Sequence, residues 1–185
     1  MVPDSLREYL ETIGQLDQPT QAFALMGYYL STFTEIEMSL NELFGQLLRL
    51  DWPQQRIVTA NMAFADKVHT VRALFRETAL PAEYKREGDK LLARLVSDFA
   101  AERNKVAHGF IFGHGYINGG ALIPTFRAKG KVDDDTFLMT IEDAILRLSD
   151  MMTASGHLLE MATNTKAKQA DLEAVAAIEM QRIRM

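Results

Sequence analysis

The residues best suited to chemistry lie together at 103–108, in the run Arg-Asn-Lys-Val-Ala-His. The guanidinium of Arg103 presents its N–H donors in a fixed plane that can bind two oxygens of a phosphate at once. The imidazole of His108 exchanges protons near neutral pH, which suits general acid–base work. This short run is therefore the first candidate for a working site.

The element that must position these residues is a helix predicted over about 81–108. Its buried side is carried by Leu92, Leu95, Phe99 and Val106. Arg103 falls one turn after Phe99, at the edge of this stripe, and Asn104 falls one turn before His108. An arginine in that place is costly to desolvate unless it meets an acceptor, so its ordinary explanation is an ion pair with the first long helix. The ordinary role of His108-Gly109 is to end the helix.

Apolar periodicity predicts further helices at about 5–16, 20–50, 53–78 and 141–163. In the third, Ile57 belongs to the expected buried stripe; in the last, Leu159 does. Asp51 or Trp52 is expected to begin the third helix, before a first-turn proline at Pro53, and Thr140 with Asp143 to form a capping box. Residues 166–185 are expected to form either a terminal helix that docks on a partner or a fraying tail.

Between residues 109 and 139 the pattern changes to short apolar or β-branched runs separated by glycines. We expect two or three antiparallel strands there, with Phe112, Leu122, Ile123 and Phe126 packed against a helix. The run Asp133-Asp134-Asp135 is expected to be an exposed acidic turn rather than a cation site. The predicted fold is mainly α: a single domain over 1–185, an up-and-down bundle of four or five helices with its core at about 20–163 and a small antiparallel β insertion after the fourth helix.

Composition limits the possible functions. The 185 residues include no cysteine, which excludes disulfides, thiolate catalysis and cysteine-based zinc sites. The net charge of −5 argues against a protein that works by sequence-independent phosphate binding over its whole surface. Between Tyr84 and His108, six Lys and Arg residues face four Asp and Glu residues, a local excess of +2. The ordinary explanation of this excess is a solvated helix face.

The other histidines are weaker candidates. His114 lies six residues after His108, but two histidines do not make a metal site, and we expect no metal and no cofactor. His69 and His157 fall within helical patterns and are expected to be structural or surface residues.

We also expect no signal peptide and no membrane span, and hence a cytoplasmic protein without a membrane partner. Trp52 is expected to pack the start of a helix.

Arg103, four intervening residues and His108, at the end of a long helix and before Gly109, resemble the Arg-x4-6-His motif of the HEPN domain superfamily. Asn104 matches the polar residue that commonly follows the arginine. Residues 33–41 look like the family's leading helix, and residues 65–68 look like its second. The resemblance covers roughly residues 20–159, and its motif is short.

The resemblance implies a homodimer in which two motifs form one composite cleft. It implies metal-independent RNA cleavage, in which a ribose 2′-OH attacks the adjacent phosphorus and leaves a cyclic phosphate and a 5′-OH end. His108 would act as general acid–base, Arg103 would bind the phosphate, and Asn104 would orient the phosphate or His108. Glu37 or Glu102 would pair with Arg103 at rest, and Lys105 adds a neighbouring positive charge.

Two functions stay open at the level of sequence. The first is a HEPN-type endoribonuclease of a toxin–antitoxin or defence pair, with RNA as its substrate and a separate antitoxin, possibly a nucleotidyltransferase-like protein, as its partner. The second is a non-catalytic dimeric interaction module of the same fold. The feature that would distinguish them is whether two copies of Arg103 and His108 face each other across an open cleft.

Overall fold

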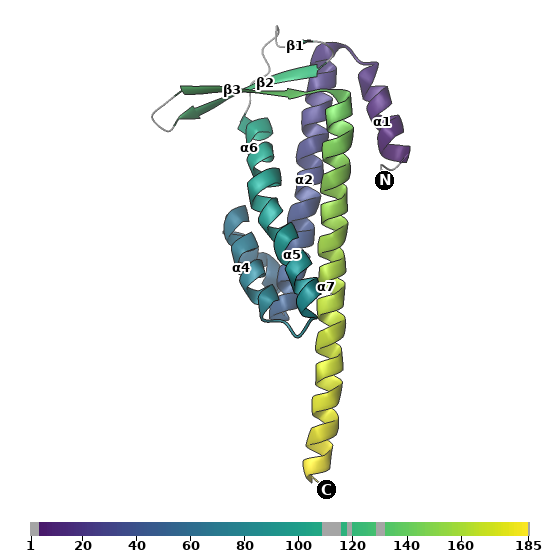
Figure 1. The fold of residues 1–185 in the computed structure, drawn as a ribbon, viewed down its shortest axis with the longest axis vertical. Helices are drawn as coiled ribbons and strands as arrows, with labels where there is room; N and C mark the ends of the chain where they lie inside the picture. The colour runs from purple at the N-terminus through teal and green to yellow at the C-terminus, as the bar shows by residue number, and fades with distance from the viewer. Residues whose placement is uncertain (1–3, 109–115, 118–119, 129–131, 185) are drawn as a thin grey trace. The chain divides into compact units, whose positions relative to one another are not determined.

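The computed structural model describes residues 4–108, 116–117, 120–128 and 132–184, and the protein is mainly helical (Figure 1). The helices are α1 (Asp4–Gly14), α2 (Gln18–Leu48), α3 (Trp52–Thr59), α4 (Phe64–Arg76), α5 (Ala82–Arg94), α6 (Ala101–His108) and α7 (Ile141–Arg184). A π-helical segment, Leu95–Ala100, joins α5 to α6. The strands are β1 (Tyr116–Ile117), β2 (Gly120–Ala128) and β3 (Val132–Met139).

The chain forms two compact units, and the long helices α2 and α7 contribute to both. The first unit consists of Met1–Ile36 and Ser97–Ala154. Its core is built from apolar side chains of α1, the first part of α2, the segment 97–108 and the first part of α7. The buried residues include Leu10, Leu25, Tyr29, Phe33, Ile36, Phe99, Val106, Leu148 and Met151.

All strands in the described part of the chain lie between Tyr116 and Met139, within the first unit. They form one antiparallel sheet in the order β1-β2-β3, and β2 contacts α6. The acidic run 133–135 was expected to be a turn, but it is part of β3, where Asp133 is paired with Arg127 of β2. The predicted helix packing of Phe112, Leu122, Ile123 and Phe126 lies outside the described side chains.

The second unit consists of Glu37–Val96 and Ser155–Met185. Apolar side chains from the rest of α2, from α4 and α5 and from the rest of α7 fill it, among them Leu40, Leu43, Val71, Phe75, Leu92, Leu95 and Leu158. Gly88 of α5 is buried against side chains of α4 and α7. A Cβ at this position would lie 2.5 Å from the Phe75 ring and 2.8 Å from the Met161 methyl, so only glycine fits without a shift.

Two predicted helix starts are confirmed. The side chain of Asp51 accepts from the backbone N–H of Gln54, whose own side chain accepts from the backbone N–H of Asp51. The hydroxyl of Thr140 accepts from the backbone N–H of Asp143, and the Asp143 carboxylate accepts from the N–H of Thr140. Each pair satisfies backbone donors that have no partner inside the helix.

Other expectations were wrong. The predicted helix over 53–78 is two helices, α3 and α4, because the backbone is extended at Ala63. Ile57 is 75% exposed and not part of a buried stripe. Helix α7 continues to Arg184, well past the predicted end at about residue 163, and Leu158 is buried in place of Leu159. Trp52 is also exposed, and the guanidinium of Arg56 lies 4.7 Å over its ring.

Candidate functional site

Helix α6 carries the predicted motif at its C-terminal half. Val106 is fully buried and fixes the inner face of the helix, while Asn104 and Ala107 are exposed. Arg103 is half-buried, at the edge of the apolar side, as its spacing from Phe99 predicts.

The guanidinium of Arg103 meets an aromatic ring rather than an acidic residue. Its central carbon lies 4.9 Å from the centroid of the Phe33 ring, which α2 supplies to the same unit. The ring face carries partial negative charge and stabilises the cation. Unlike a carboxylate, it is not a strong hydrogen-bond acceptor for the guanidinium N–H groups. Among the residues that the structure describes, no carboxylate pairs with Arg103.

The neighbouring Glu102 is already engaged. It pairs with Arg147 of α7, and it also accepts the phenolic hydrogen bond of Tyr29 at 3.0 Å. Burial, followed by the negative charge of Glu102, raises the pKa of Tyr29 far above its usual value, so the phenol stays protonated and donates. The expected pairing of Glu102 with Arg103 is therefore replaced by a Tyr29–Glu102–Arg147 network.

The remaining predicted residues fall in different places. Asn104 is exposed, and Lys105 is half-buried with a partner of its own. Position 108 is the last residue of α6, four residues after Asn104, and the side chain of His108 lies outside the described part of the structure. Glu37 belongs to the second unit. Arg103, Asn104 and Lys105 are consecutive residues of α6, and their side chains differ in surroundings: Arg103 lies on Phe33, Asn104 is exposed, and Lys105 is half-buried.

The described residues include no group of three His, Asp or Glu side chains able to hold a metal ion. His69 and His157 are exposed. His114 lies outside the described residues. The guanidinium of Arg103 can offer hydrogen bonds and charge stabilisation to an anion.

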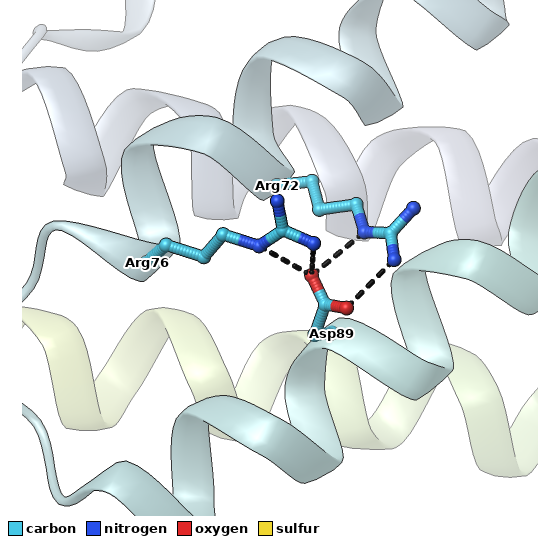
Figure 2. Close-up of polar contacts among 3 residues, drawn as sticks. All are labelled: Arg72, Arg76 and Asp89. Carbon is cyan, nitrogen blue, oxygen red and sulfur yellow. Dashed lines mark hydrogen bonds and ion pairs between the residues drawn. The ribbon is translucent and has the colours of Figure 1, made fainter.

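A second charged cluster, in the other unit, was missed by the sequence reasoning (Figure 2). Arg72 of α4 binds both oxygens of the Asp89 carboxylate, at 2.7 and 2.6 Å. Arg76, one turn later, binds one of these oxygens through Nε at 2.8 Å and through Nη2 at 2.6 Å. The hydrogen bond from Arg72, and then that from Arg76, lower the pKa of Asp89. The four-residue spacing of the two arginines was a visible signal, but nothing in the sequence indicated which acid they share.

The second unit also contains a hollow of about 350 Å³ between α5 and α7, lined by Tyr84, Gly88, Leu91, His157, Glu160 and Met161 among others. The hydroxyl of Tyr84 accepts a hydrogen bond from the Asn164 amide at 2.8 Å. The lining of this hollow mixes apolar side chains with charged groups of both signs, so it indicates no single class of ligand.

No helix in the described part of the chain is long and apolar enough to cross a membrane. Comparisons with protein-family models, with curated proteins and with solved structures found no match.

Proposed function

We propose that this protein is a metal-independent endoribonuclease of the HEPN type, with a HEPN-like helical bundle that carries a small β insertion. The observation that supports this best is the environment of Arg103. The neighbouring carboxylate of Glu102 is occupied by Arg147 and Tyr29, and the guanidinium of Arg103 rests on the ring of Phe33. Among the described residues no carboxylate neutralises its charge, so N–H donors there can bind a phosphate.

In the proposed reaction, His108 removes the proton of a ribose 2′-OH, which attacks the adjacent phosphorus. The bond from phosphorus to the 5′-oxygen breaks, and that oxygen takes a proton and leaves as a hydroxyl. Arg103 stabilises the negative charge that grows on the phosphate oxygens. Exposed Asn104, one turn before position 108, orients the phosphate or the imidazole. A homodimer would bring a second copy of the motif to the same substrate and provide the second proton-transfer group.

The test is RNA cleavage in the presence of EDTA. Wild-type protein should cut several RNAs, leave cyclic phosphate ends and leave DNA intact, because DNA lacks the 2′-OH. His108→Ala should abolish cleavage, and Ala107→Ser, an exposed neighbour on the same helix, is a matched control that should keep it. Wild-type protein that cuts no RNA, or equal cleavage by His108→Ala, would contradict the proposal. Light scattering at micromolar concentration should give the mass of a homodimer.

A second candidate is a non-catalytic, dimeric interaction module of the same fold. The observation that favours it is the apolar surface of α3, where Trp52 is 64% and Ile57 is 75% exposed. Its neighbour Val58 is also exposed, at 45%, and large apolar side chains on the surface are a feature of protein-binding sites. The cleavage assay separates the two candidates, since a module of this kind would leave every RNA uncut.

A further inference from the structure

We propose that the second unit binds the backbone phosphates of the RNA strand in a basic hollow between the end of α4 and α5. The hollow has a volume of about 310 Å³ and is lined by Arg76, Ala82, Lys85, Arg86, Asp89 and Lys90. Figure 1 shows α4 beside α5, and Figure 2 shows the Asp89 cluster between them. The identity of the strand as RNA rests on the proposed function; the binding of phosphates rests on the charges described below.

Two of the cations are held in position by the protein itself. Arg76 is fixed by Asp89 through Nε and Nη2, but its side chain is 55% exposed and its Nη1 group makes no hydrogen bond to a described residue. Lys85 donates to the carbonyl oxygens of Arg76 and Thr78, at 2.9 and 3.1 Å, at the end of α4. Charged groups already fixed in position lose little conformational freedom when they bind an anion.

The single carboxylate inside the hollow cannot cancel these charges. Asp89 is shared by Arg72 and Arg76, so the cluster of three keeps a net charge of +1. Its hydrogen bonds to two guanidinium groups hold the pKa of Asp89 below its usual range, so it stays ionised and does not add a donor of its own. It therefore orients Arg76 without neutralising it.

Two further cations stand on the exposed side of α5. Arg86 pairs with Glu83 at 3.1 Å and with Glu87 at 3.8 Å, and Lys90 pairs with Glu87 at 2.9 Å. All four side chains are more than half exposed. Exposed pairs of this kind are weak, so a phosphate can replace the glutamate. Arg86 and Lys90 are four residues apart, about 6 Å along the helix axis, which is close to the spacing of successive phosphates in an extended strand.

The balance of charge explains how an acidic protein can hold such a strand. The chain carries −5, but this local group has five cations, Arg72, Arg76, Lys85, Arg86 and Lys90, against three acids, Glu83, Glu87 and Asp89. Phosphate contacts position a strand without reading its sequence or its sugar. The hollow should therefore bind RNA and DNA alike, while only RNA can be cleaved.

The test measures binding and cleavage separately. The probe is a fluorescein-labelled single-stranded DNA of about 12 nucleotides, whose binding is followed by anisotropy at about 50 and 200 mM salt. The double variant Arg86→Gln and Lys90→Gln should weaken binding about tenfold and lower the salt slope by about 1.4, since each lost contact with a single strand contributes about 0.7. The double variant Glu83→Gln and Glu87→Gln should strengthen binding, because it removes the competing carboxylates.

The matched control is Arg56→Gln with Lys166→Gln, which removes the same charge from exposed positions of the same unit outside the hollow. Unchanged binding in the Arg86/Lys90 variant, or an equal loss in the control, would overturn the proposal, and thermal melts identify any variant that has lost its fold. Cleavage of RNA by wild-type protein is scored in parallel. If RNA stays intact while DNA binding depends on Arg86 and Lys90, the ribonuclease proposal fails and the phosphate-binding hollow stands.

Discussion

In each unit of this molecule a carboxylate joins neighbouring helices, but the two clusters differ in net charge. In the first unit, Glu102 serves one arginine, Arg147, and one neutral phenol, Tyr29. In the second, Asp89 serves two arginines, Arg72 and Arg76. The first carboxylate is balanced by one cation, whereas the second leaves a positive charge in excess.

The same difference extends to the whole units. The first has 7 Lys and Arg against 13 Asp and Glu, a net charge of −6; the second has 13 against 12, a net charge of +1. The first unit is therefore unsuited to unspecific phosphate binding, and a phosphate there would need a local site such as the one proposed at Arg103. The second unit can attract a nucleic-acid strand through a patch. The two proposed sites thus belong to different units.

The largest expected effect on stability comes from the carboxylate of the first unit. Glu102→Ala removes the acceptor of both Arg147 and the buried hydroxyl of Tyr29, and should lower the free energy of unfolding by about 3 kcal/mol. Denaturant titration of wild type and Glu102→Ala measures this change in the free energy of unfolding. Glu8→Ala, an exposed glutamate of the same unit, is the control and should change stability by less than about 0.5 kcal/mol. Equal effects would mean that the network contributes nothing.

A smaller loss is expected in the second unit. Asp89→Asn should cost about 1–2 kcal/mol, because its arginine partners are partly exposed and can be solvated again. Arg72→Ala should cost more than Arg76→Ala, since Arg72 binds both oxygens and is the more buried of the two. If Asp89→Asn destabilised the protein more than Glu102→Ala, the comparison of the two units would be reversed.

The Asp89 cluster should also show in the dependence of stability on pH. The pKa of Asp89 is lower in the folded protein than in the unfolded chain, so its ionised form stabilises the fold above the unfolded pKa. This contribution is lost as the pH falls below about 4 and through the lowered pKa. Stability measured from pH 7 to pH 2 should fall more steeply for wild type than for Asp89→Asn. Parallel curves would contradict the assignment.

The smallest expected effect on stability is at Arg103. Arg103→Ala loses only the contact with the Phe33 ring, which contributes about 0.5–1 kcal/mol at a partly exposed site, yet it should abolish RNA cleavage. Arg147→Ala makes the matched comparison: it should destabilise the protein more, because it leaves Glu102 without its cation. A large loss of stability in Arg103→Ala would mean that this arginine is a structural residue.

The sequence by itself determined the local features. Apolar periodicity predicted a mainly helical protein. The capping box at Thr140 was predicted from its residue types, and the helix start at Asp51 or Trp52 from the proline that follows; the structure places this cap at Asp51. It also placed Arg103 at the edge of a buried stripe, one turn after Phe99, where the structure has it half-buried. These features depend on contacts within about one turn of the chain, so the order of residues carries them.

Only the tertiary structure decided the partners. Glu102 and Arg147 are 45 residues apart, and Asp89 of α5 binds two arginines of the preceding helix α4. Periodicity within one helix could not predict which acid pairs with which arginine. The expected pairing of Glu102 with Arg103 was wrong because the two side chains leave α6 in different directions, one toward Arg147 and the other onto Phe33. The break before α4 and the exposure of Ile57 were decided in the same way. Which face of a short helix is buried depends on the neighbouring helices against which it packs, and these are set by the whole chain.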